Sequence, residues 1–174
     1  MGPRRTLAGA LAVPLLLLAA CGGGDTSIAD PPISPGSTTS SPADRPQRES
    51  PEHFIRRWAD AEKRMENTGK TAEYAALSRG CIPCESLIKD VTKFYAAGGF
   101  IRWNGLSVLS VEKTGPRNGG ATGYEVRTNS TPTHYKKRAG GRLTTLKGGV
   151  TTELLSLKRI DGDWTLVARA RVSK

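Results

Sequence analysis

Three cysteines carry the most specific chemistry available to this chain, because a thiol can accept an acyl group, form a disulfide, exchange electrons or bind a metal. Cys21 stands alone after an apolar stretch, whereas Cys81 and Cys84 form a Cys-x-x-Cys pair. The two histidines, His53 and His134, are the only imidazoles. The sequence therefore directs attention first to Cys21 and to the Cys81 and Cys84 pair.

Cys21 follows the features of a secretory signal. Arg4 and Arg5 precede the apolar run Leu7–Ala20, which is too short for the ~20 residues that a spanning helix needs. The stretch Leu18-Ala19-Ala20-Cys21 resembles the bacterial lipobox, whose cysteine receives a diacylglyceryl group before the chain is cut on its N-terminal side. The resemblance implies that residues 1–20 are a lipoprotein signal peptide. It also implies attachment through Cys21 to the extracytoplasmic side of the cell membrane; the alternative is a plain secreted protein.

Residues 21–49 predict a tether. After the lipidated cysteine they consist mainly of Gly, Ser, Thr, Pro and Asp, with almost nothing to bury, so we expect no folded structure there. Two acyl chains on one cysteine hold a protein stably at a bilayer. The predicted contact with the membrane is therefore an anchor and not a spanning helix.

The Cys81 and Cys84 pair admits three interpretations. An exported domain meets an oxidising compartment, so a disulfide is the leading one. Pro83 suits the first turn of a following helix, and Cys81 near the positive end of that helix leaves a redox-active pair open. Zinc needs four ligands, and only two histidines far apart in sequence are available to complete a site. We predict a disulfide, no metal and no cofactor.

Motifs for catalysis are not found in the sequence. There is no Gly-x-Ser-x-Gly, no phosphate loop and no dinucleotide fingerprint. His53 and His134 are expected to be solvated or bonded locally, and Asp161 and Asp163 to shape a turn around Gly162. A binding or interaction protein is therefore favoured over an enzyme.

Charge is the remaining signal. The chain has a formal net charge of +10, and the excess of lysine and arginine lies toward its C-terminal half. We predict a basic surface that contains Lys136, Lys137, Arg138, Arg169 and Arg171, the last two on one face of a strand. Such a surface suits anionic lipid, an anionic wall polymer or an envelope protein, but not nucleic acid in that compartment. The alternative is a solvated surface that serves only solubility.

Residues 50–174 suffice for one hydrophobic core and predict a single domain. Ser50 and Pro51 indicate the start of a helix that ends before Gly69. Its apolar stripe comprises Phe54, Trp58, Ala61 and Met65. Two further helices are expected, over 71–78 and from the cysteine pair to Gly98 and Gly99.

The rest of the domain has strand patterns. We expect strands over 101–111, 123–128, 142–160 and 164–172, with Asp161-Gly162 as the turn of the last hairpin. Helices followed by strands predict an α+β fold, with N-terminal helices packed on one face of a curved antiparallel sheet.

These features resemble the actinobacterial lipoproteins grouped as domain of unknown function 6318, most specifically over Leu77–Gly99, and the similarity covers 52–172. The resemblance implies the envelope of high-GC Gram-positive bacteria and brings no known activity. The order of elements and the stretch Asp161-Gly162-Asp163-Trp164 are more distantly similar to the nuclear transport factor 2-like fold. That likeness implies a cone-shaped sheet, used by enzymes and by non-catalytic modules.

Two functions follow. The first is a lipid-anchored, non-catalytic module that binds a partner protein or an anionic envelope polymer. The second is a cone-fold protein that holds a small apolar ligand or a substrate between its first helix and the sheet. A closed, filled cone favours the first function, and an open pocket with converging polar groups favours the second.

Overall fold

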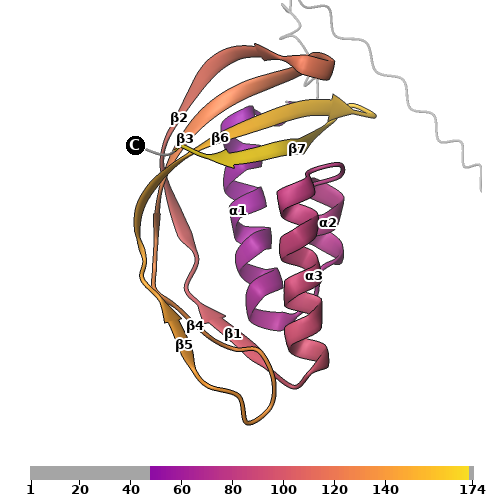
Figure 1. The fold of residues 1–174 in the computed structure, drawn as a ribbon. Coiled ribbons are helices and arrows are strands. Elements are labelled where there is room, and N and C mark those ends of the chain that lie inside the picture. The colour runs from indigo at the N-terminus through magenta and orange to yellow at the C-terminus, as the bar shows by residue number, and fades with distance from the viewer. Residues whose placement is uncertain (1–47, 173–174) are drawn as a thin grey trace, which may run out of the picture. The chain divides into compact units, whose positions relative to one another are not determined.

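The computed structural model describes residues 48–172. Cys21, the predicted signal peptide and most of the predicted tether lie outside this range. Three helices precede the strands: α1 (Pro51–Thr68), α2 (Ala72–Leu77) and α3 (Ile82–Ala96). The strands are β1 (Phe100–Trp103), β2 (Leu106–Arg117), β3 (Ala121–Ser130), β4 (Thr133–Lys136), β5 (Thr144–Leu146), β6 (Gly149–Ile160) and β7 (Asp163–Arg171). The predicted α+β class is confirmed, with the helices on the concave side of curved antiparallel strands (Figure 1).

Helix α1 begins and ends where its capping residues predict. The Ser50 hydroxyl accepts a hydrogen bond from the His53 N–H at 3.1 Å. Gly69 closes the helix in the left-handed conformation, with φ of 74°, and donates its N–H to the carbonyl of Met65. The stripe from Phe54 to Met65 is buried against the sheet. No helix within residues 48–172 is both long and apolar enough to cross a membrane.

The cysteine pair forms the predicted disulfide at the start of α3. Cys81 is the residue before the helix and Cys84 lies in its first turn, and both side chains are buried. Ile82 between them is exposed. The disulfide therefore belongs to the core at the junction of α2 and α3.

The strands form two sheets instead of the single one expected. β2, β3, β6 and β7 make a four-stranded sheet in that order, and β1, β4 and β5 make a three-stranded sheet. The strands expected over 101–111 and 142–160 are each broken, after Trp103 and after Leu146. β4 lies outside all four of the strands expected from the sequence. The hairpin turn at Asp161-Gly162 is confirmed.

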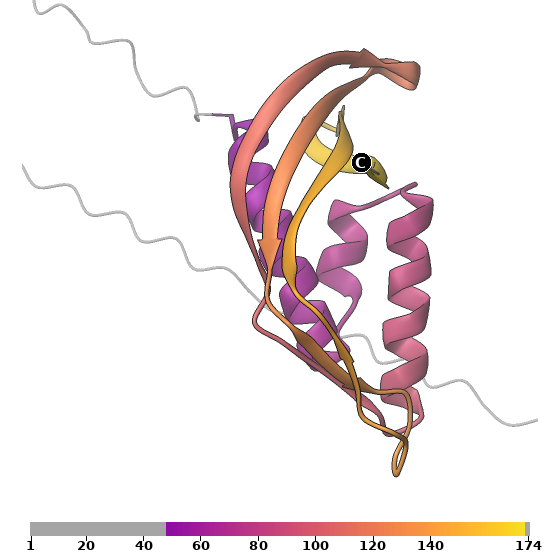
Figure 2. The same ribbon diagram turned by 60° about the vertical axis from the view of Figure 1, so that its left-hand side comes forward.

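A bend in the chain separates the two sheets, and its residues explain why the strands break there (Figure 2). Gly105 has φ of 97°, a conformation that suits glycine. Pro132 has no N–H to donate to a ladder. A Cβ on Gly148 would collide with the Ser130 carbonyl oxygen, so the backbones approach too closely there for a larger residue. Helix α1 lies on the concave side of the curved strands (Figure 1).

The folded domain starts before Ser50. The carbonyl of Glu49 accepts hydrogen bonds from Trp164 Nε1 at 2.9 Å and from Arg159 Nη2 at 3.2 Å. Two hydrogen bonds from Arg57 to its carboxylate hold the pKa of Glu49 at about 2. Glu49, placed in the tether by its composition, is therefore fixed to α1 and to the last hairpin.

Candidate functional site

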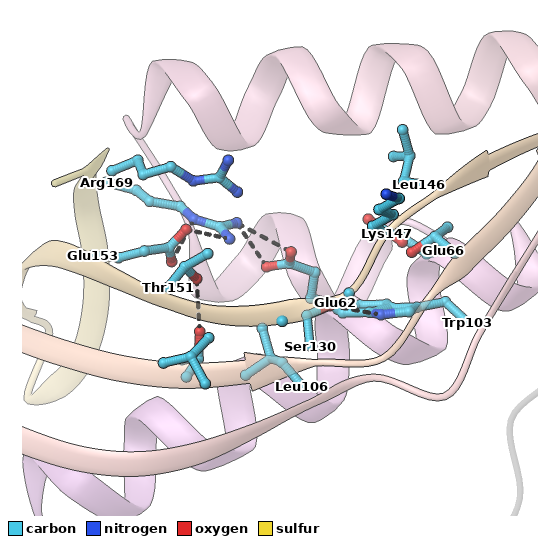
Figure 3. Close-up of a pocket in the computed structure, with 16 residues that line it drawn as sticks. Glu62, Glu66, Trp103, Leu106, Ser130, Leu146, Lys147, Thr151, Glu153 and Arg169 are labelled. Atoms are coloured by element: carbon cyan, nitrogen blue, oxygen red, sulfur yellow. Dashed lines mark hydrogen bonds and ion pairs between the residues drawn. The ribbon is translucent and has the colours of Figure 1, made fainter. Parts of the chain in front are cut away.

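A buried ion cluster joins α1 to the sheet. Arg169 of β7 donates to both carboxylate oxygens of Glu62 on α1, at 3.1 and 2.9 Å. It also makes two hydrogen bonds of 3.0 Å to Glu153 of β6. Both carboxylates are buried, and Figure 3 shows the arginine between them. One arginine thus bridges two carboxylates from different layers of the fold.

Burial sets the electrostatics of this cluster. It raises the pKa of Glu62, and the charge of Arg169 opposes that rise. Burial also acts to lower the pKa of Arg169, but Glu62 and Glu153 outweigh it, so the pKa lies above the ordinary value and the guanidinium stays charged. Two carboxylates share one cation, so the ionised cluster carries a net negative charge.

Glu66 lies one helical turn beyond Glu62 and is half-buried. No described side chain or backbone group makes a hydrogen bond or an ion pair with its carboxylate. Burial and the neighbouring charge of Glu62 raise the pKa of Glu66 to about 8. Glu66 is therefore a carboxyl group that is largely protonated at neutral pH and open to a partner.

These acidic residues line an open pocket of about 300 Å³ between α1 and the bend of the sheets. Apolar walls come from Trp103, Leu106 and Leu146, and Thr128 and Thr151 contribute hydroxyls that bond to each other at 3.1 Å. The indole of Trp103 donates to the Ser130 hydroxyl at 3.1 Å. The interior is thus acidic, with apolar and hydroxyl-bearing walls.

The rim of the pocket has the opposite charge. Lys147, at the bend, and Arg171, at the end of β7, line the pocket but are exposed. Water and salt screen their charges more than those of the buried carboxylates. The pocket therefore presents an acidic interior behind a solvated positive rim.

The predicted basic surface is not one surface, and the prediction that Arg169 is exposed is wrong. Arg169 and Arg171 do share a strand face, but that face points toward the pocket and α1, where Arg169 is paired and only 19% of its side chain is exposed. Lys136 ends β4, and Lys137 and Arg138 follow it in the loop to β5, beside the end of α3. Of the predicted basic residues, this second group remains together, with Lys137 and Arg138 exposed and Lys136 partly buried.

The histidines are bonded locally, as predicted. His53 Nδ1 lies 2.9 Å from a Glu49 carboxylate oxygen, and His134 Nδ1 lies 2.9 Å from the Thr145 hydroxyl. Neither lines the acidic pocket. Within residues 48–172, no group of three or more histidine, cysteine or acidic side chains is arranged to hold a metal ion.

Comparison with known proteins concerns the fold alone. No family model matches the chain, and no curated protein matches it. The intermembrane-space region of the chloroplast protein ARC6 is similar over 71% of this chain and 94% of its own, with 10% identity and a TM-score of 0.50. A structure from Catenulispora acidiphila covers 70% of this chain and 89% of its own, with 16% identity and a TM-score of 0.44. The protein Aln2 from a Streptomyces species covers 71% and 91%, with 14% identity and a TM-score of 0.39.

Proposed function

We propose that this chain is a lipid-anchored, non-catalytic binding protein on the extracytoplasmic face of the cell membrane, and that its pocket holds a small organic cation. The lipobox-like stretch ending at Cys21 supports the anchor. The resemblance to domain of unknown function 6318 over Leu77–Gly99 supports the envelope location. Of the two functions considered from the sequence, the open pocket with converging polar groups favours the ligand-binding one.

The observation that carries the proposal is the unpartnered carboxylate of Glu66 in the pocket. A carboxylate that is half-buried without a partner is costly when ionised, and a bound cation removes that cost. Glu62 and Glu153 add a net negative charge through their shared arginine. The wall of Trp103, Leu106 and Leu146 suits the carbon atoms of an organic ligand better than a hydrated metal ion.

A binding function fits this pocket better than catalysis. The Ser130 hydroxyl accepts a hydrogen bond from the indole of Trp103 and donates one to the Thr131 carbonyl. It therefore has no base to activate it as a nucleophile. Among the described residues that line the pocket there is no histidine or cysteine.

Choline, tetramethylammonium and tetraethylammonium test the proposal, because their charge does not change with pH. If binding requires ionised Glu66, affinity should rise roughly 50-fold from pH 6 to pH 8 as the carboxyl ionises. Glu66→Gln should weaken binding and remove this pH dependence, measured by calorimetry. Glu112→Gln, which removes an exposed carboxylate from β2, is the matched control.

The neutral compound 3,3-dimethylbutan-1-ol has the shape of choline without its charge. It should bind at least tenfold more weakly than choline if the carboxylates provide the attraction. Equal binding of the two compounds, or failure of all three cations to bind, would reject a cation pocket. Binding that Glu66→Gln leaves unchanged would assign the cation to another site.

The anchor has its own test. Cys21→Ser should give a precursor that keeps residues 1–20 and carries no lipid, because the thiol is the acyl acceptor. Mass spectrometry and detergent phase partitioning measure both properties. A Cys21→Ser protein of normal mature mass that still partitions into detergent would contradict the anchor but leave the pocket proposal intact.

A further inference from the structure

The loop between β4 and β5 is fixed to the end of α3. The Ala139 N–H donates to the Ala97 carbonyl at 2.8 Å. A Cβ on Gly99 would collide with the Lys136 carbonyl, so the loop packs directly against the backbone that follows α3. The rings of Phe94 and Tyr135 are stacked, with centroids 5.7 Å apart. The loop is therefore held on a defined scaffold.

This scaffold presents a cluster of cations that we call the basic tip. It comprises one residue in the last turn of α3 and four from β4 and the following loop: Lys93, Lys136, Lys137, Arg138 and Arg142. Four of them line an open hollow of about 580 Å³ together with Phe94, and among the described residues Asp90 is the one acid that lines it. None of the five forms an ion pair with a described residue.

Local structure accounts for only part of this charge. The C-terminal end of a helix carries about half a negative charge, so α3 favours roughly one nearby cation and not five. Lys137 over Phe94 and Lys136 over Phe100, with Nζ 5.7 and 6.0 Å from the ring centroids, direct two ammonium groups onto the aromatic surface. Fixed like charges repel one another, and an anion relieves that repulsion.

We propose that the basic tip binds an extended phosphate polymer. Four cations and one acid line the open hollow, and this excess of positive charge suits several successive charges along a chain better than one small anion. Arginine offers two donors to a phosphate, and Arg138 and Arg142 both line the hollow.

The tip lies far from the point at which the chain enters the domain. The ends of α1 and α3 lie together, because the Tyr95 hydroxyl donates to the Glu66 carbonyl and Gly69 packs against Tyr95. α1 starts at the other end of the domain, one helix of 18 residues away (Figure 1). That length is about 27 Å at ~1.5 Å per residue. The tip thus lies opposite the end at which the chain enters the domain.

Long-chain polyphosphate, inorganic phosphate and vesicles with or without phosphatidylglycerol are the four probes. The full chain, purified in detergent or placed in the vesicles as needed, should bind polyphosphate and lose affinity as salt rises. The triple variant Lys137→Gln, Arg138→Gln, Arg142→Gln should bind at least tenfold more weakly. Exposed substitutions usually alter stability by less than ~0.5 kcal/mol, and thermal unfolding checks that the variant is folded.

A second triple variant controls for total charge. Lys113→Gln, Arg127→Gln, Lys158→Gln removes three exposed cations from the four-stranded sheet and should change binding less than twofold. An equal loss of polyphosphate affinity in both triple variants would show that binding depends on the total charge of the protein, and it would overturn the proposal. Tip-dependent binding to phosphatidylglycerol vesicles without binding to polyphosphate would overturn it too and assign the tip to the membrane. Equal affinity for inorganic phosphate would replace the polymer site with a small-anion site.

Discussion

Replacing Arg169 by glutamine is expected to lower the free energy of unfolding by about 3–5 kcal/mol, because it leaves two buried carboxylates without their cation. Glu62 and Glu153 are both buried, and Arg169 makes hydrogen bonds to each of them. A glutamine amide is neutral and cannot bridge both. For a domain of this size the loss is a large part of the total stability.

The matched control is Arg171→Gln, two residues farther along the same strand. Arg171 is exposed and has no ion pair with a described residue, so its loss should alter stability by less than ~0.5 kcal/mol. Urea unfolding at pH 7 measures both variants. Similar small losses in the two would show that the buried cluster does not stabilise the fold.

The loss in free energy of unfolding caused by Arg169→Gln should also depend on pH. Burial already raises the pKa of Glu62, and removal of the guanidinium raises it further. At low pH the unpaired carboxylates take up protons and no longer need a cation. The difference between Arg169→Gln and the natural protein should therefore shrink at pH 4, and a deficit that is constant with pH would indicate lost packing instead of unpaired charge.

The helix ends and the last hairpin turn were predicted well because each depends on residues that are close together in the sequence. The cap at Ser50, the glycine after α1 and the Asp161-Gly162 turn depend on a few neighbouring residues, and each has the expected role. The prediction of the disulfide needed only the spacing of Cys81 and Cys84 and the expectation that the domain is exported. The α+β class followed from the order of the elements.

Predicting the pocket required knowledge of contacts between residues that lie far apart in the chain. Alternation correctly placed Arg169 and Arg171 on one strand face, but which face turns toward α1 depends on how the helices pack across the sheet. Two acidic residues on buried faces did indicate the ion cluster in the sequence. Glu62 follows Trp58 at four residues on the apolar stripe of α1, and Glu153 precedes the buried Leu155 by two residues. One acidic residue on the buried face of the helix and another on the buried face of the strand indicate that a cation is buried between the two carboxylates.

The bend was also difficult to predict. Thr and Val are abundant in strands, so 142–160 has the composition of one strand. The break at Gly148 arises because its backbone meets that of Ser130, which belongs to β3. The pocket exists because of this bend, so its shape was not predictable from either segment alone.

Glu66→Gln is expected to stabilise the domain at pH 8.5 by about 1–3 kcal/mol and to leave it unchanged near pH 4. The pKa of Glu66 is raised from 4.5 to about 8 in the folded protein. Between these values the folded state binds more protons than the unfolded state, so stability falls as pH rises. Glutamine keeps the shape of the side chain but does not titrate, and this part of the pH dependence disappears.

Urea unfolding at pH 4, 6 and 8.5 measures this difference without any ligand. Glu112→Gln, an exposed carboxylate on β2, serves as the control and should not gain stability over the same range. A Glu66→Gln protein that is less stable than the natural one at pH 8.5 would show that the carboxylate has a favourable partner in the fold. It would then be a structural residue and not an open binding group.

The sign of this effect distinguishes a binding role from a structural one. Removing a charged group that stabilises the fold should lower the free energy of unfolding, as is expected for the cluster of Arg169, Glu62 and Glu153. Glu66 has the opposite expectation, because it is half-buried and no described residue forms an ion pair with it. A residue that destabilises its own fold is typical of a site in which function requires an unsatisfied group. A bound cation should abolish the advantage of Glu66→Gln, since the ligand supplies the ion-pair partner that Glu66 lacks among the described residues.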